Sequence, residues 1–221
     1  MPSTPLSPHL SQKRGYLSAV RDEQARATRR AIVDAAGRLF IAKGYAATTI
    51  DEIAAAAGVS RKTVFNAGGG KLALLKDAYD WALVGDDEPV SMEQRSEVQE
   101  ILVTDDPVEA VRLWTVMITG TAVRAAPVAG VLAAAAHVDA QAAELQQTAD
   151  RNKLAGARAF IAHLESIGTL REGLTGAEAA DLCWLAMDAG PYLRLVVERG
   201  WSPERYRRWL TAAMTTELLG G

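Results

Sequence analysis

Several side chains of this sequence are of the kinds that bind phosphates and the edges of nucleic-acid bases. They lie close together in the chain: Arg61, Lys62, Thr63, Asn66 and Lys71. Arginine and lysine pair with phosphates, and arginine and asparagine also make paired hydrogen bonds to guanine and adenine. For Arg61 and Lys62 the alternative is an ordinary solvated helix face. The elements that carry these residues decide between the two explanations.

A helix-turn-helix pattern surrounds this group. Thr49 and Glu52 have the spacing of a capping box, which predicts a short helix over 50–57. In the turn Gly58-Val59-Ser60, glycine allows a sharp reversal and serine caps the next helix, from Arg61 to about residue 66. The second helix of such a pair enters the major groove with its N-terminal residues nearest the bases. Nucleic-acid contact is therefore the favoured interpretation.

Longer helices flank the pair. Apolar residues recur at spacings of three and four from about Arg21 until Lys43-Gly44, and again over 71–83. Three glycines, Gly68 to Gly70, precede the second of these helices, and a linker follows at 85–89. The predicted domains are a disordered basic arm over 1–20, a DNA-binding domain over 21–84 and a second domain over 90–221.

The second domain has helical stretches and no convincing strand. The stretches cover 91–103, 107–125, 128–167, 176–199 and 203–219, separated by Pro, Gly and Asp. The 128–167 stretch is one long helix or two. The fold class predicted for the whole chain is all-α.

Charge and composition narrow the functional classes. Residues 1–80 carry a net charge of about +5 and the remainder about -8, which suggests a polyanion-binding head on an acidic body. The lone cysteine, Cys183, excludes an internal disulfide and a cysteine-based zinc site. The N-terminus lacks the apolar segment of a signal peptide, and no run approaches 18 uninterrupted apolar residues. We expect a soluble, cytoplasmic protein without a membrane partner.

Metal and catalytic sites find little support. His137 and His163 lie 26 residues apart, and their neighbouring carboxylates stand two positions away, which on a helix is a different face. The aspartate pairs at 86–87 and 105–106 sit in predicted turns, where aspartate commonly caps helices. No nucleophile–base pattern, phosphate loop or nucleotide fingerprint is evident. We expect no enzyme activity, no metal and no cofactor.

The helix-turn-helix segment has many positions at fixed offsets: Ile32, Ala35-Ala36, Leu39-Phe40, Lys43-Gly44-Tyr45, Thr48-Thr49-Ile50, Ile53-Ala54, Ala57-Gly58-Val59-Ser60, Thr63-Val64-Phe65, Lys71 and Leu74-Leu75. This pattern resembles the DNA-binding domain of TetR-family regulators over about residues 28–76. The resemblance implies that the following residues contact DNA: Thr49, Arg61, Lys62, Thr63, Phe65, Asn66 and Lys71. Phe65 has either a packing or a contact role. The family usually has another aromatic three residues after the recognition-helix aromatic. Here Phe65 is followed instead by Asn66-Ala67-Gly68-Gly69-Gly70, which puts the shape of this junction in doubt.

The resemblance also implies a body that binds a small-molecule effector and forms a homodimer. Candidate pocket residues, for which ordinary core is the alternative, are Trp114, Met117, Ile118, Thr121, Trp184, Met187 and Tyr192. Candidate interface residues are Leu182, Leu185, Trp201, Tyr206, Trp209 and Met214. The predicted function is a ligand-responsive repressor that binds a palindromic, double-stranded operator and is released by its effector. The alternative is a helical ligand-binding or interaction protein whose DNA-binding head is degenerate at the glycine triplet.

Overall fold

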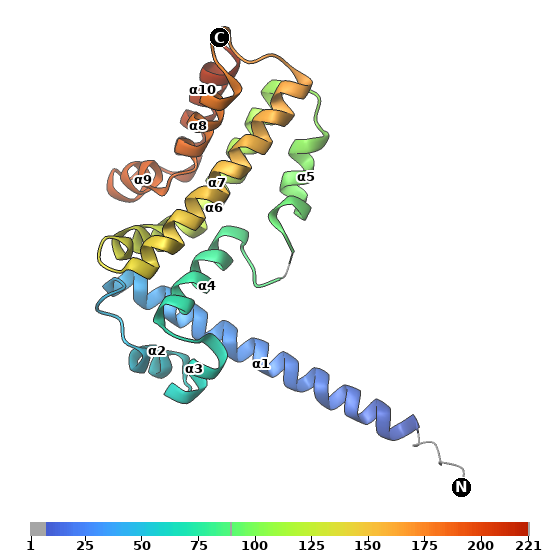
Figure 1. Ribbon diagram of the computed structural model, residues 1–221, viewed down its shortest axis with the longest axis vertical. Coiled ribbons are helices and arrows are strands. Elements are labelled where there is room, and N and C mark those ends of the chain that lie inside the picture. The colour runs from blue at the N-terminus through green and yellow to red at the C-terminus, as the bar shows by residue number, and fades with distance from the viewer. Residues whose placement is uncertain (1–7, 89, 221) are drawn as a thin grey trace.

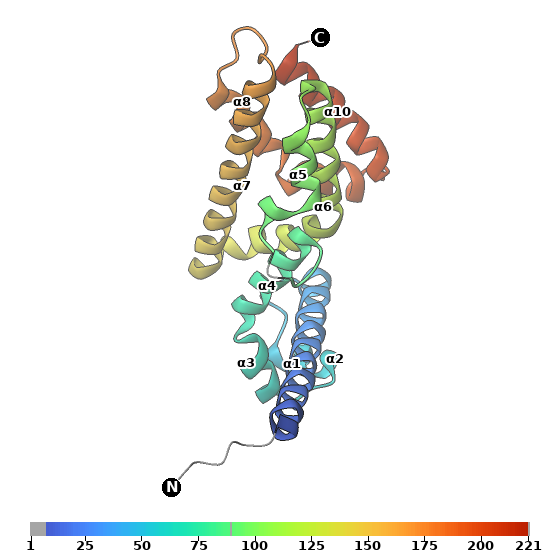
Figure 2. The ribbon, with the colours of Figure 1, turned by 90° about the vertical axis from the view of Figure 1, so that its right-hand side faces the viewer.

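The computed structural model describes residues 8–88 and 90–220, with only the backbone given for 8–20. These residues form ten α-helices and no strand, which confirms the all-α prediction. The molecule is elongated, with a helical head at one end and a larger body at the other (Figures 1 and 2). The head consists of α1 (Pro8–Lys43), α2 (Ile50–Ala57), α3 (Arg61–Gly68) and α4 (Lys71–Val84).

The body begins after the 85–89 linker with a short 3-10 turn. Its elements are η1 (Met92–Gln94), α5 (Ser96–Val103), α6 (Pro107–Ala136), α7 (Ala140–Ile167), α8 (Gly176–Ala186), α9 (Ala189–Tyr192), η2 (Leu193–Glu198) and α10 (Pro203–Leu219). The long helices α6 and α7 run beside each other, with α5 on one side and α8 to α10 on the other (Figure 1). The predicted 176–199 helix is divided at Met187–Asp188, where Asp188 caps α9 by accepting the Gly190 N–H at 2.7 Å.

The N-terminal helix is longer than the sequence indicates. The predicted arm is disordered up to residue 20, whereas α1 starts at Pro8 and projects well beyond the rest of the head (Figure 1). Proline is tolerated in the first turn of a helix, and only Gly15 opposes helix formation between Pro8 and Arg21. The predicted disorder is therefore wrong for 8–20, and residues 1–7 lie outside the described chain.

The helix α6 passes through Pro127, where a break is predicted. Apolar residues on both sides of the proline, including Ala126 and Val128, are buried, so tertiary packing offsets the lost backbone hydrogen bond. The open question of 128–167 is settled as two helices, because Asp139 caps a new helix by accepting the Gln141 and Ala142 N–H groups.

By length and hydropathy α6 also resembles a membrane-spanning helix. It packs against α4, α5, α7, α9 and α10, and it carries more buried residues than any other described helix. Its buried apolar residues therefore contribute to the packing of the protein interior.

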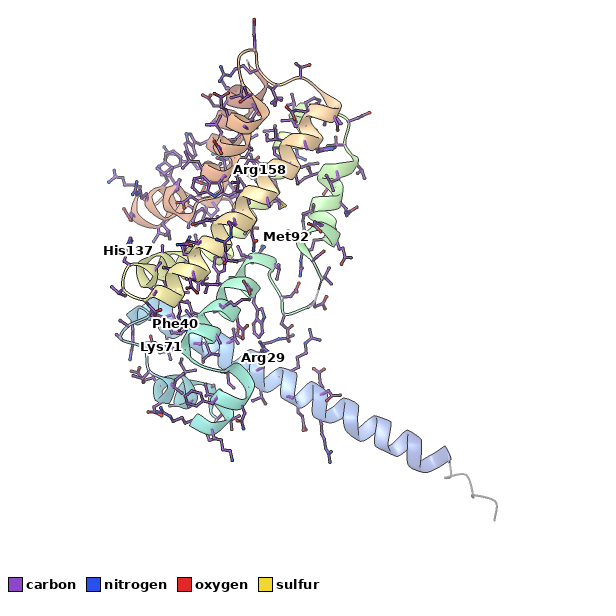
Figure 3. All side chains as sticks on the ribbon, viewed as in Figure 1. Arg29, Phe40, Lys71, Met92, His137 and Arg158 are labelled. Atoms are coloured by element: carbon purple, nitrogen blue, oxygen red, sulfur yellow. The ribbon has the colours of Figure 1, made fainter. Side chains whose placement is uncertain are left out.

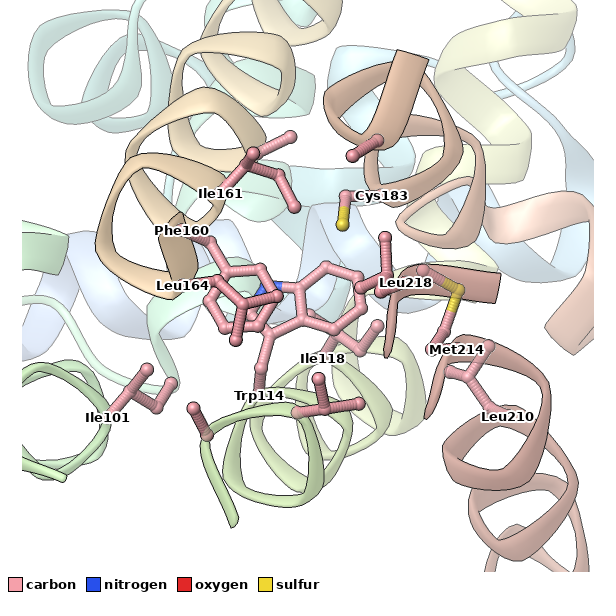
Figure 4. Packing of buried hydrophobic residues seen from close by; sticks show 14 of the residues in the cluster. Ile101, Trp114, Ile118, Phe160, Ile161, Leu164, Cys183, Leu210, Met214 and Leu218 are labelled. Atoms are coloured by element: carbon pink, nitrogen blue, oxygen red, sulfur yellow. The ribbon is translucent and has the colours of Figure 1, made fainter. Parts of the chain in front are cut away.

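Two hydrophobic cores share α6. The body core contains Trp114 stacked on Phe160, with ring centroids 4.8 Å apart, and residues of α8 and α10 (Figure 4). The head core contains Phe40 and Leu74, and is completed by Val128 and Leu132 from α6. Pro127 thus lies on α6 between the residues of one core and those of the other. The head and body are joined by packing as well as by chain.

Charged residues reinforce this junction at the end of α4. Asp87 receives hydrogen bonds from Arg26 and Arg30 of α1, and its side chain is only 6% exposed. Its neighbour Asp86 receives two from Arg95, at 2.8 and 3.0 Å. From α6, Arg124 donates to the carbonyl oxygens of Ala82 and Leu83 at 3.2 and 3.1 Å. The aspartates at 86–87 therefore have turn and ion-pair roles, and we call this set the junction clip.

Candidate nucleic-acid interface

The helix pair α2–α3 is built by its caps. Thr49 accepts the Glu52 N–H at 3.2 Å, and the Glu52 carboxylate accepts the Thr49 N–H at 3.0 Å, so the predicted capping box is present. Gly58 ends α2 with φ +68°, and Ser60 accepts the Thr63 N–H at 3.1 Å to begin α3. These bonds satisfy backbone groups that the helix ends would otherwise leave open.

A further ion pair ties α2 to the end of α1. Lys43 donates to the Glu52 carboxylate at 2.6 Å. This bond, together with those from Thr49, lowers the pKa of Glu52 to about 2. The carboxylate that caps α2 is therefore ionised at neutral pH.

The outer face of α3 carries most of the predicted contact residues. Arg61, Lys62, Phe65 and Asn66 are exposed, and Thr63 is half-buried with its hydroxyl 2.8 Å from that of Ser60. Phe65 is 46% exposed, so it does not serve as a core anchor, and Val64 fills the interior instead. An exposed aromatic and two cations on one short helix form a surface suited to phosphates, base edges and thymine methyl groups.

Lys71 lies apart from this face. Its ammonium nitrogen is 4.4 Å from the Tyr45 ring centroid and 3.4 Å from the carbonyl oxygen of Ala46. It therefore sits beside the loop between α1 and α2, near Phe40, whose ring contacts that of Tyr45 (Figure 3). The sequence pattern includes Tyr45 but gives no sign that it holds Lys71.

The glycine triplet between α3 and α4 is an ordered turn. Gly68 ends α3 and is buried; a Cβ atom there would come within 2.5 Å of Leu74. Gly69 has φ +71° and ψ -145°, a conformation that side chains oppose. Gly70 has φ -87°, and a Cβ atom there would meet nothing within 4 Å. The triplet replaces the missing aromatic with a tight turn in which the first two glycines are required.

The candidate pocket residues divide into core and surface. The structure brings Trp114, Ile118 and Tyr192 together in the body core, with Met117 and Met187 packed against it. Trp184 lies on the surface, where its indole N–H donates to the carbonyl oxygen of Asp150 at 3.2 Å. Thr121 is half-buried on α6, outside this core. The members of this set that lie in the core are therefore packed against one another in this conformation.

The candidate interface residues divide in a similar way. Leu185 and Trp209 are exposed, at 58% and 43%, on α8 and α10. Tyr206 and Met214 are buried in the body core, and Leu182 and Trp201 pack against it. Leu185 and Trp209 are thus the two most accessible residues of this set, and their spacing in the sequence does not distinguish them from the buried ones.

His137 and His163 lie in different environments. His137 is exposed at the turn after α6, and the Nε2 atom of His163 is buried without a hydrogen-bond partner in the described chain. Among the side chains described, those of residues 21–88 and 90–220, no three His, Cys, Asp or Glu groups lie together to hold a metal ion.

Comparison with known families supports the helix-turn-helix assignment. Residues 32–78 match the model for bacterial regulatory proteins of the TetR family. This segment of the chain is a TetR-family DNA-binding domain. The match places this segment in a family of transcriptional regulators, which is a non-enzymatic family. None of the curated proteins is significantly similar in sequence to this chain.

Solved structures share the fold of most of this chain at low sequence identity. A protein from Saccharomonospora viridis in complex with choline is 19% identical, with a TM-score of 0.67 over 87% of this chain and 98% of that one. NalD, the secondary repressor of the MexAB-OprM multidrug efflux pump in Pseudomonas aeruginosa, is 20% identical, with a TM-score of 0.64 over 89% and 98%. The SmeT–triclosan complex is 20% identical, with a TM-score of 0.67 over 87% and 92%.

Two side-chain contacts in this interface are not predicted by the sequence. Asp51, an unremarked residue in the first turn of α2, pairs with Arg61 at 2.7 Å. Tyr45 supports Lys71 from the preceding loop. Each contact joins residues that are ten or more positions apart, so neither has a local sequence signal.

Proposed function

We propose that this protein is a cytoplasmic, ligand-responsive repressor that binds a palindromic operator as a homodimer. The observation that carries the proposal is the exposed face of α3, on which Arg61, Lys62 and Asn66 surround Phe65 behind a serine cap. A helix presented in this way suits the major groove, and its cations suit the phosphates beside it. Thr49 and Lys71 would contact the phosphate backbone of the DNA on either side of α3.

The ordered glycine turn supports a working head. The alternative function, a ligand-binding protein with a degenerate head, depends on damage at this turn. Gly68 and Gly69 instead meet definite packing and backbone requirements between α3 and α4. The glycine triplet, which suggested a degenerate head, is therefore better explained as a defined turn between α3 and α4.

A small-molecule effector is proposed on two grounds. Two solved structures of this fold contain choline and triclosan, and a third protein of this fold is the repressor of a multidrug pump. In this chain, aromatic and methionine side chains such as Trp114, Met117 and Tyr192 meet between α6 and the C-terminal helices. Rearrangement of this apolar core would open the pocket, with α4 transmitting the change to the head. An effector that weakens DNA binding is itself bound less tightly on DNA.

Dimer formation through α8 and α10 is proposed from their exposed apolar residues. Leu185 and Trp209 would lie at the centre of the contact, with the Trp201 ring edge-on to Trp209 at 6.3 Å. Aromatic residues are enriched in the buried centre of subunit interfaces. Two heads related by a two-fold axis would read two half-sites of a palindrome.

The decisive experiment is selection of bound fragments from a random duplex library, followed by affinity measurements at several salt concentrations. Lys71→Ala should weaken binding to all sequences and reduce the salt slope by about one unit, as for one lost phosphate contact. Lys76→Ala is the matched control, because Lys76 pairs with Asp80 on an exposed turn of α4. No selected sequence and no salt-dependent binding would contradict the proposed function. An unchanged slope in Lys71→Ala would remove Lys71 from the contacts.

A further inference from the structure

An ion pair links the starts of the two helix-turn-helix helices. The Nη1 atom of Arg61, the first residue of α3, donates to the carboxylate of Asp51 in the first turn of α2 at 2.7 Å. The side chains are 59% and 67% exposed, so both lie on the surface of the head. Within the described chain, the Nε and Nη2 atoms of Arg61 have no acceptor.

A second contact, made within α3, restricts the position of the Arg61 side chain. The guanidinium carbon of Arg61 lies 5.6 Å from the ring centroid of Phe65, one helical turn further along. Cations are attracted to aromatic faces at this distance. Arg61 is therefore held by a carboxylate on one side and a ring on the other, with the remaining edge of its planar fork open.

The orientation of an arginine decides what it can recognise. Reading guanine requires the fork to meet two acceptors of one base edge in the same plane, whereas a phosphate can be met from many directions. A carboxylate beside the fork also repels nearby phosphates, which disfavours the less selective contact. Asp51 itself has no donor with which to bind a phosphate at neutral pH.

We propose that Asp51 is a specificity-determining positioning residue, which holds the open edge of the Arg61 fork toward a base and away from the phosphate backbone. The proposal rests on the proposed DNA binding by α3. It predicts opposite effects on two measurable quantities when the Asp51 charge is removed. Binding to non-specific DNA becomes stronger, and discrimination between base pairs becomes weaker.

The test uses full-length protein and the operator selected by the wild type. In Asp51→Asn, affinity for a non-specific duplex should rise and its salt slope should steepen by about one unit, because Arg61 becomes free to meet a phosphate. The preference at one base pair of each half-site should fall by up to about fivefold, the upper end of the range for an exposed ion pair. Arg61→Ala should lose that same preference and serves as the reference.

Two further variants separate positioning from general charge and from misfolding. Asp51→Glu keeps the charge at this place and should restore much of the preference. Asp80→Asn removes the same charge from α4, where Asp80 pairs with Lys76, and should leave the preference unchanged. Helical circular dichroism of each variant should match that of the wild type.

The outcomes distinguish this proposal from the proposed function. A wild type that selects no sequence refutes both. A wild type that selects an operator, with Asp51→Asn discriminating as well as the wild type, refutes only the positioning role. Equal losses in Asp51→Asn and Asp80→Asn would also refute it, because the effect would then follow net charge.

Discussion

Gly69 offers a sharp test of the turn that joins the recognition helix to α4. Its φ of +71° and ψ of -145° lie in a region open almost only to glycine, and an alanine Cβ there would also approach the Cβ of Ala73 to 3.2 Å. Residues held in such conformations cost on the order of 1–3 kcal/mol. For a chain of about 200 residues, this predicts that Gly69→Ala lowers the Tm by roughly 2–12 °C.

The adjacent glycine is the matched control. Gly70 has φ -87°, and a Cβ atom there meets nothing within 4 Å, so alanine is compatible with the native backbone. Gly70→Ala should be neutral or stabilise by about 0.4–1 kcal/mol, because it restricts the unfolded chain.

Thermal unfolding followed by circular dichroism, together with operator affinity, measures both variants. Gly69→Ala should lower stability and weaken operator binding, because the turn fixes the angle between α3 and α4. If Gly69→Ala is as stable as Gly70→Ala, the backbone conformation described for the turn is not the one that the protein adopts. In that case the triplet is a loose joint.

Three further predictions concern the body and its junction with the head. Leu185→Glu should raise the dissociation constant of the proposed dimer at least about tenfold, whereas Val138→Glu, at another exposed apolar residue, should leave it unchanged. Unchanged sedimentation of Leu185→Glu would exclude α8 from the interface. Hydrogen bonds from Arg26 and Arg30 lower the pKa of Asp87, so Asp87→Asn should be less stable than the wild type at pH 7. That difference should shrink as pH falls below about 4, the unfolded value, in urea titrations; a pH-independent difference would argue against the ion pair. Burial raises the pKa of Cys183 to about 12, so a thiol reagent should react only after unfolding, and rapid labelling of the native protein would contradict the packing of α8.

Local chemistry made the head predictable. Thr49, Gly58 and Ser60 act on backbone groups within a few residues of themselves, and each forms the cap that its type and position indicate. Val64, one of the positions of the family pattern, is fully buried. The start of α1 was missed because helix propensity over 8–20 is weak evidence beside Pro- and Ser-rich composition.

The body was less predictable because its outcome depends on contacts distant in the chain. Pro127 predicts a break by local rules, yet packing on both sides keeps α6 continuous. Tyr206 and Trp209 look equally suited to a subunit interface, but α10 turns the first inward and leaves the second exposed. From the sequence, the aspartates of the junction clip are identified only as turn residues, because their arginine partners lie up to 61 positions away in the chain.

The sharing of α6 between two cores has a consequence for exchanging DNA-binding heads between regulators. Val128, Leu132 and Ala135 of α6 line the head core, although they follow the 85–89 linker in the chain. A head transplanted at that linker would be closed by foreign side chains, and mismatched volumes there cost stability as in any core. A chimaera that keeps this core must therefore carry the second half of α6 and the first half of α7 with the head, because Ala142 and Ala149 of α7 also belong to it. The part of the protein to be transplanted is thus discontinuous in sequence.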